Sequence, residues 1–249
     1  MRKLLVVLTV GLAFATTAVG WADTLLVYEV HSPERVSPAG RKTGGTTRKR
    51  ILIGANRVRI EEESAIKILV KDKHEIYTYV IGGAPIYCRH GFPLDLKSEI
   101  PADLYENLQR SLQDSGPGTA HTKALGARTV GKWPAQGTEI DVVAGASEEV
   151  KASAWLTDQL PQVDYALVSE LLAALSSLSR SRPAAALTVE LAKLPGVPVR
   201  IERDVRNEME GASHQDEQLV SVEEHAASDD DYRPPKGAKR SEYFFCFEN

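Results

Sequence analysis

The sequence predicts an α+β protein in which one antiparallel β-sheet packs against two or three helices. Several runs of β-forming residues alternate apolar and polar side chains, a pattern that gives a sheet one buried face and one wet face. Only two or three segments repeat leucine at helical spacing, and each such stripe must be buried against another element. The apolar face of the sheet is the obvious partner for these stripes.

The composition is that of an ordinary globular protein. The chain has 249 residues with 43% hydrophobic and 26% charged side chains, which argues against a wholly disordered chain. The formal net charge of -4 gives no electrostatic reason to expect nucleic-acid binding. Aromatic residues make up only 6% of the chain, so we expect a mostly aliphatic core.

The first 22 residues have the three-part pattern of a secretory signal peptide. Arg2 and Lys3 are followed by a mainly apolar run of about 15 residues, and Gly20 and Ala22 fit a cleavage point before Asp23. An uncleaved anchor is the alternative, but the run is shorter than the roughly 20 residues that span a bilayer. We therefore expect a mature chain that begins at residue 23, lies in the periplasm or outside the cell, and has no transmembrane helix.

The first 90 residues predict an antiparallel meander. The turn signals are Gly54 to Asn56 and Asp72-Lys73. The stretch 32–49, with its prolines, glycines and basic residues, is expected to be either a mobile loop or a wide hairpin connection. The predicted strands are 24–31, 50–60, 66–81 as a hairpin, and 86–90.

Helices enter in the second half. Pro101 opens a helix, Asp164 is expected to cap a second helix over 164–179, and 184–194 predicts a third. A turn is expected at Pro134 to Gly137, and the charged stretch 206–217 is expected to be a loop. The predicted later strands are 127–133, 138–144, 149–156, 197–205 and 218–225.

The order of these pieces resembles a family of exported bacterial proteins of unknown function whose fold is like that of the lipoprotein carriers LolA and LolB. Most of residues 24–240 take part in the resemblance. The stretches that carry it are GANRVRIEEE, IKILVKDKHEIYTYV, RTVGKWPAQGTEIDVV, ASAWLTDQL, KLPGVPVRIE, LVSVEEH and DDDYRPPKGAKR. The resemblance implies a single domain over 23–249, built as a half-barrel of strongly curved antiparallel sheet with the helices on its concave face.

In the carrier relatives the concave side holds acyl chains, so the resemblance implies a non-enzymatic binding protein for a lipid or another apolar small molecule. A filled core is the alternative, and the protein would then be a structural or interaction module that meets another protein of the cell envelope. The leucines of the two longer helices are the residues expected to line a cavity: Leu104, Leu108, Leu112, Leu167, Leu171 and Leu175.

No enzymatic, metal or cofactor signature is present in the sequence. The motifs G-x-S-x-G, H-E-x-x-H, G-x-G-x-x-G and the phosphate loop are all absent, so we expect neither catalytic residues nor a cofactor. His225 with Asp229, Asp230 and Asp231 could imitate a cation site, but an acidic turn explains the same pattern.

Two further features have competing explanations. Cys88 and Cys246 are the whole thiol inventory, and in an exported chain such a pair favours a disulfide over two free thiols or a metal site with His90. A basic cluster in the first loop could meet lipid headgroups or an acidic partner, or be solvated loop charge. Its members are Arg35, Arg41, Lys42, Arg48, Lys49 and Arg50.

Overall fold

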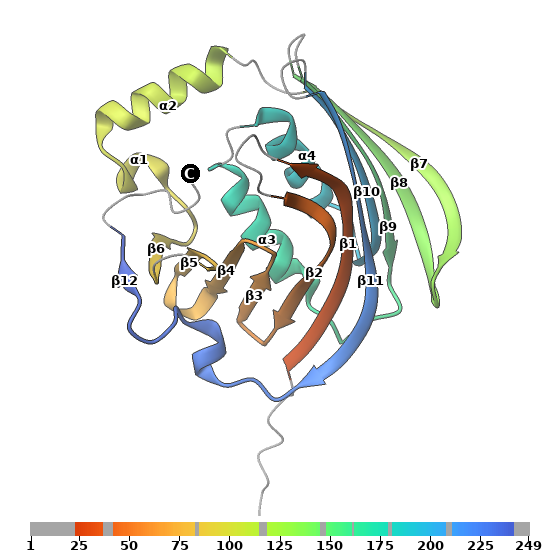
Figure 1. The fold of residues 1–249 in the computed structure, drawn as a ribbon, viewed down its shortest axis with the longest axis horizontal. Helices are drawn as coiled ribbons and strands as arrows, with labels where there is room; N and C mark the ends of the chain where they lie inside the picture. Colours follow the sequence, from red (N-terminus) through yellow and green to blue (C-terminus); the bar gives the residue numbers. More distant parts are fainter. Residues whose placement is uncertain are drawn as a thin grey trace, which may run out of the picture.

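The computed structural model confirms the predicted α+β class. It describes residues 23–36, 42–82, 85–114, 119–144, 148–160, 162–178, 181–207 and 211–241. The predicted signal peptide, residues 1–22, lies outside them. A single twelve-stranded sheet bends strongly around two helices, α3 (Tyr165–Ser176) and α4 (Arg182–Ala192), which lie on its concave side (Figure 1).

The first six strands form the predicted meander. Along the sheet the order is β12-β6-β5-β4-β3-β2-β1-β11-β10-β9-β8-β7. Strands β1 to β6 lie side by side in chain order, and so do β7 to β11. The two halves join where β1 pairs with β11. All neighbouring pairs are antiparallel except β12 with β6. The bounds of the first half are β1 Asp23–Val36, β2 Lys42–Ile53, β3 Arg57–Glu61, β4 Ala65–Val70, β5 Glu75–Val80 and β6 Ile86–Gly91.

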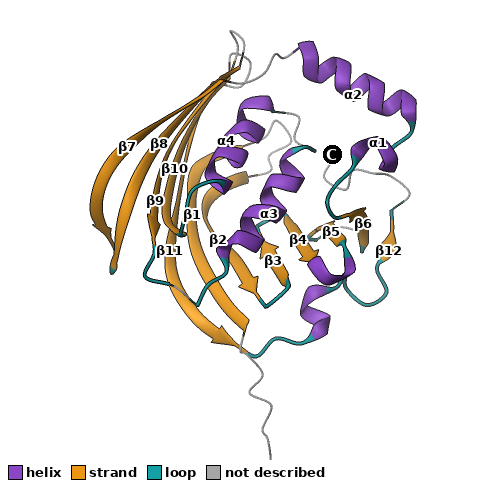
Figure 2. Ribbon diagram, turned by 180° about the vertical axis from the view of Figure 1, so that it is seen from behind, coloured by secondary structure: helices purple, strands orange, loops and turns teal. Residues whose placement is uncertain are grey.

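The second half of the sheet forms the broad wing on one side of Figure 1. Its strands are β7 Thr119–Val130, β8 Trp133–Ala144, β9 Glu148–Thr157, β10 Val197–Asn207 and β11 Gly211–His225, with the short β12 Lys239–Arg240 at the far edge. Two helices, α1 (Leu96–Glu99) and α2 (Ala102–Asp114), stand apart from the concave face, beyond β6 (Figure 2). Two helices therefore occupy the concave side.

Of the two predictions for 32–49, the mobile loop is wrong for the described residues, and the alternative of a hairpin connection is nearer to the structure. β1 runs on to Val36, and β2 already begins at Lys42, with Thr24 paired to Ile53 at one end and Val36 to Lys42 at the other. The register shifts between Ser32 and Arg35, so Pro33 lies in an irregularity of the strand, where proline is tolerated. Proline and glycine therefore mark a distorted part of a long hairpin.

The position of the turn between β7 and β8 was also predicted wrongly. The β7–β8 turn lies at Gly131-Lys132 instead of Pro134 to Gly137, because Gly131 adopts a φ of 58° that glycine tolerates without strain. Pro134 is inside β8, outside the stretch that pairs with β9, which begins at Gln136.

The charged stretch 206–217 is largely strand, since β10 and β11 pair from Arg200 to Asn207. Charged residues are stable there because opposite charges face each other across the two strands. Arg200 donates to Asp216 at 2.9 Å through both Nε and an Nη, and Asp204 lies 2.9 Å from His214.

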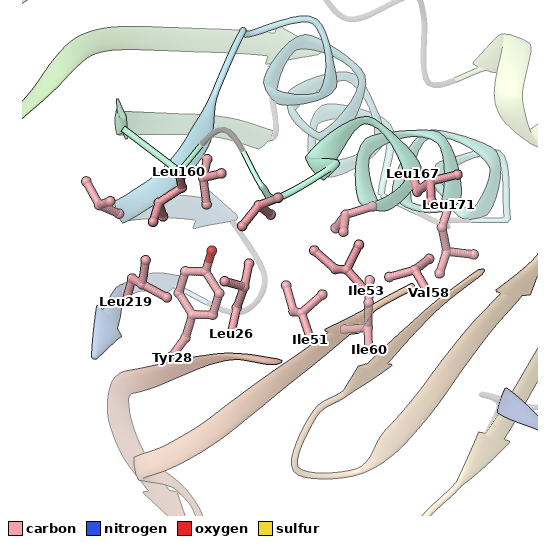
Figure 3. Packing of buried hydrophobic residues seen from close by; sticks show 14 of the residues in the cluster. Leu26, Tyr28, Ile51, Ile53, Val58, Ile60, Leu160, Leu167, Leu171 and Leu219 are labelled. Atoms are coloured by element: carbon pink, nitrogen blue, oxygen red, sulfur yellow. The ribbon is translucent and has the colours of Figure 1, made fainter. Parts of the chain in front are cut away.

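The main core lies between helix α3 and the concave face of strands β1 to β4 (Figure 3). The side chain of Asp164 accepts a hydrogen bond from the Ala166 amide, as expected of a cap. Leu167, Val168 and Leu171 then follow at the spacing of one helical face and are almost fully buried. The sheet contributes inward-facing residues of alternating position, which are Leu26, Tyr28, Ile51, Ile53, Val58 and Ile60.

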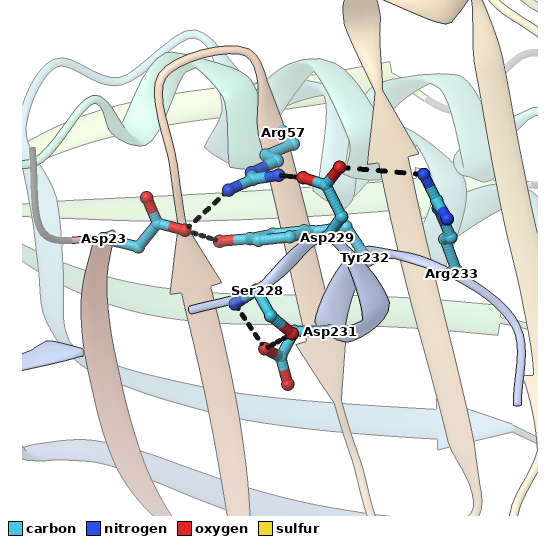
Figure 4. A network of polar contacts seen from close by, with 7 residues as sticks. All are labelled: Asp23, Arg57, Ser228, Asp229, Asp231, Tyr232 and Arg233. Carbon is cyan, nitrogen blue, oxygen red and sulfur yellow. Dashed lines mark hydrogen bonds and ion pairs between the residues drawn. The ribbon is translucent and has the colours of Figure 1, made fainter. Parts of the chain in front are cut away.

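The convex face of β1 to β4 is covered by the short 3-10 helix η2 (Asp229–Tyr232). The Tyr232 hydroxyl donates to a carboxylate oxygen of Asp23 at 2.8 Å, and the guanidinium of Arg57 bridges Asp23 and Asp229 (Figure 4). Ser228 caps the turn through the carboxylate of Asp231. The first residue of β1 is thereby joined to a segment more than 200 positions later in the chain.

We expect Leu171→Ala to destabilise the fold by about 2–5 kcal/mol, because it removes a fully buried side chain from the contact between α3 and the sheet. Urea unfolding followed by circular dichroism measures this change. Leu104→Ala on α2 is the matched control, since Leu104 is half exposed and its loss should stay within about 0.5 kcal/mol. Equal costs at the two sites would contradict the assignment of the core.

Candidate ligand-binding site

A cavity of about 420 Å³ remains beside the main core, between helices α3 and α4 and the concave face of the sheet. Strands β1 and β2 line one side, β10 and β11 the other, and the connection from β3 to β4 closes one edge. The volume falls in the lower part of the roughly 300–1,000 Å³ typical of small-molecule sites. It is large enough for one small ligand.

The cavity has an apolar wall, supplied largely by the helices. Helix α3 presents Leu172, one residue beyond the buried Leu171, and α4 presents its last turn. The apolar residues along this wall and the adjoining strands are Val30, Leu172, Leu191, Ala192, Pro198 and Ile201. Such a surface suits a hydrocarbon chain, since removing apolar area from water is favourable.

The sheet side of the cavity carries a buried ion pair. The Nζ of Lys49 lies 2.6 Å from a carboxylate oxygen of Glu217, and both side chains are less than 10% exposed. Lys49 also lies over the ring of Tyr28, with its Nζ 5.5 Å from the ring centroid. Burial is the largest single influence and would lower the pKa of Lys49, but Glu217, Tyr165 and Glu62 together outweigh it and raise the pKa, so the lysine stays charged.

Tyr28 and Tyr165 complete this polar group. The Tyr28 hydroxyl donates to the Pro198 carbonyl at 2.9 Å, at the point where the register between β9 and β10 shifts. Burial raises the pKa of the Tyr28 hydroxyl well above its usual value, and the neighbouring Tyr165 and Glu217 raise it further. Tyr28 is therefore a neutral hydrogen-bond donor that stabilises β10 where its register shifts at Pro198.

A second set of charges lies at the edge of the cavity. Burial would raise the pKa of Glu62, but the positive charges of Lys67, Lys49 and Arg203 together lower it, so Glu62 is ionised. Its carboxylate accepts a hydrogen bond from Lys67 Nζ at 2.6 Å. The Nε of Arg203 is buried and has no hydrogen-bond partner among the described residues.

The structure separates the leucines that were predicted to line a cavity. Leu167 and Leu171 are buried in the main core against the sheet, and Leu175 packs on the edge of that core. Leu104 is half exposed on α2, outside the concave face. Helix α2 includes Leu108 and Leu112, whose side chains are not among those described. A cavity-lining role for these six residues stays a prediction, whereas Leu172 and Leu191 line the described cavity.

The basic cluster of the first loop is divided by the sheet. Arg48 and Arg50 are exposed, but Lys49 between them points into the protein, so the expectation of solvated loop charge is wrong for Lys49. The side chains of Arg35, Arg41 and Lys42 are outside the described set. Strand alternation explains the split, since neighbouring side chains leave opposite faces of the sheet.

The sequence also predicted a disulfide and considered a cation site. Cys88 is buried on β6, while Cys246 lies outside the described residues, so their pairing stays a prediction. Asp229, Asp230 and Asp231 form the acidic turn η2, where Asp229 pairs with Arg57 and Asp230 with Lys236. Within the described part of the chain, no three His, Cys, Asp or Glu side chains gather as a metal site would require.

The residues that make this site polar were missed in the sequence, although a simple signal marks them. Lys49 precedes Ile51 and Ile53 by two and four positions, so it shares their inward face on β2. Glu217 stands two positions before the buried Leu219, and Arg203 two positions after Ile201. The inward direction of Lys49, which was noted only as a member of the basic cluster, and of Glu217 was overlooked because neither stretch was predicted to be a strand.

Comparison with known proteins gives matches by structure. No protein-family model matches the chain, and no curated protein matches its sequence. A LolA-superfamily protein from Nitrosomonas europaea matches with a TM-score of 0.27 and 7% identity over 86% of this chain and 90% of that one. The lipoprotein LppX from Mycobacterium tuberculosis matches with a TM-score of 0.31 and 12% identity over 82% and 88%.

MucB in complex with MucA(peri) matches with a TM-score of 0.31 and 11% identity, over 90% of this chain and 60% of that one. All three of these matches have TM-scores below 0.5. Their TM-scores are too low to carry a ligand or a partner over to this chain. Among the described residues, no helix is both long and apolar enough to span a membrane.

The buried ion pair predicts an asymmetric response to mutation. Lys49→Met should cost about 3–5 kcal/mol, because it leaves the Glu217 carboxylate buried without its partner. The double variant Lys49→Met/Glu217→Leu should recover most of this loss, and urea unfolding measures both. The exposed pair Lys193–Glu190 is the control, where Lys193→Met should cost at most about 1 kcal/mol. A double variant as unstable as Lys49→Met would argue against burial of the pair.

The cysteine prediction is checked by mass. We expect the purified chain to be about two hydrogens lighter without reductant than with it, because oxidation of Cys88 and Cys246 removes one hydrogen from each thiol. Intact-mass measurement under both conditions gives the result, with Cys88→Ser as the control that should show no such difference. Equal masses for the unsubstituted chain would exclude the bond.

Proposed function

We propose that this protein is a non-enzymatic binding protein that takes up a single-chain amphiphile in the cavity between α3, α4 and the sheet. The observation that carries the proposal is the mixed lining: Leu172 and Leu191 of the helices and the charged Lys49 and Arg203 of the sheet border the same cavity. A purely apolar ligand would make no polar contacts with the charged residues, and a purely polar ligand would bury none of the apolar surface.

The size of the cavity supports one chain per protein. The cavity has a volume of about 420 Å³ and takes up only part of the space on the concave side, because α3 already fills the space over β1 to β4. The predicted signal peptide supports a role in the periplasm or outside the cell. In this proposal the protein accepts an amphiphile outside the cytoplasm and shields its chain from water.

The test is binding of decan-1-ol, a neutral single-chain amphiphile, measured by isothermal titration calorimetry on the chain without residues 1–22. Ala192→Trp should abolish binding, because Ala192 lines the cavity and the larger ring would fill it. Val189→Trp on the same helix is the matched control, since Val189 is partly exposed and does not line the cavity. Binding that is unchanged by Ala192→Trp would place the ligand elsewhere.

An interaction module is the second candidate, and a different observation favours it. The main core is fully packed, and β7 offers a twelve-residue edge strand with mostly exposed side chains, to which an extended segment of another envelope protein could add as a further strand. Absence of binding by decan-1-ol and also by charged amphiphiles of similar chain length would favour this candidate over the first.

A further inference from the structure

The charges around the cavity are paired unequally. Its lining includes four basic residues, Arg48, Lys49, Lys67 and Arg203, and three acidic residues, Glu62, Glu63 and Glu217. Lys49 pairs with Glu217, and Lys67 pairs with Glu62, both at 2.6 Å. Arg48 and Glu63 are exposed, and the side chain of Arg48 leaves the opposite face of β2 from Lys49. Arg203 is therefore the inward cation for which the described residues provide no ion pair.

The position of Arg203 directs its charge into the cavity. It lies on β10 between Ala152 of β9 and Gln215 of β11, on the same face as the cavity-lining Ile201. Its Nε is buried without a hydrogen-bond partner in the described chain. An unpaired buried donor on a charged group is costly, so a bound acceptor at this point would be strongly favoured.

Resting on the proposed function, we infer that the amphiphile is anionic and that Arg203 receives its oxygen headgroup. The guanidinium can donate two parallel hydrogen bonds to a carboxylate or a phosphate, while the chain lies along Leu172 and Leu191. The neutral hydroxyl of Ser169, which also lines the cavity, can donate to the same group. A fatty-acid carboxylate and the phosphate of a single-chain phosphate ester share this chemistry.

The test compares four probes with the same decyl chain: undecanoate, decyl phosphate, decan-1-ol and decyltrimethylammonium. We expect at least one of the two anions to bind the unsubstituted chain about tenfold or more tightly than the alcohol, and the cation to bind most weakly. The tighter anion distinguishes a carboxylate from a phosphate. Inorganic phosphate by itself should not bind measurably, because the chain supplies much of the affinity.

Arg203→Met should lower the affinity for the preferred anion about tenfold and leave the affinity for decan-1-ol within about twofold, since methionine keeps the apolar stem without the charge. Arg203→Lys should be intermediate, because lysine keeps the charge but not the planar pair of donors. Arg206→Met on the same strand is the matched control, since Arg206 is exposed and does not line this cavity.

A second readout needs no variant. Raising the salt concentration should weaken anion binding more than alcohol binding, because only the former depends on a charge pair. Equal affinity of the alcohol and both anions, or full anion affinity in Arg203→Met, would overturn the assignment of Arg203 while leaving the proposed function intact. Failure of all four probes to bind would overturn the proposed function itself.

Discussion

The burial of the α3 leucine stripe against the inward face of β1 to β4 is the contact on which the rest of the structure depends. Leu167, Val168 and Leu171 cannot be covered within the helix, and the alternating residues of the sheet cannot be covered within the sheet. Because the sheet bends around the helix, its concave side is filled here and left partly open farther along, beside α4. The cavity lies between α3 and α4, beside the filled part of the concave face.

The open part is lined with charge, and this changes what the fold can bind. A buried pair such as Lys49 and Glu217 contributes little net stability compared with apolar residues of the same size, yet loss of either partner is costly. Together with the inward Arg203, this pair gives a polar end to a cavity whose other wall is hydrocarbon. Under the proposed function, an aliphatic interior would accept a neutral chain, whereas the charged lining of this cavity would favour a chain with a headgroup.

Much of the fold could be predicted from short-range patterns. Alternation located parts of every strand from β1 to β6, and leucine spacing with Asp164 located α3, because these signals arise from contacts of each segment with one buried face. The errors fell at 32–49, at 206–217 and at the β7–β8 turn. There, pairing with a neighbouring strand kept glycine, proline and charged residues extended, and no local pattern reports such a partner.

The amino-acid sequence by itself determined the α+β class, the identity of the core helix and the inward face of the early strands, since periodicity depends only on the geometry of each element. Only the tertiary structure decided that α2 stands apart, that η2 covers the convex face, and that Lys49, Glu217 and Arg203 meet around one cavity. The physical reason is distance along the chain: Lys49 and Glu217 are 168 positions apart, and their attraction acts only after the sheet has brought them together.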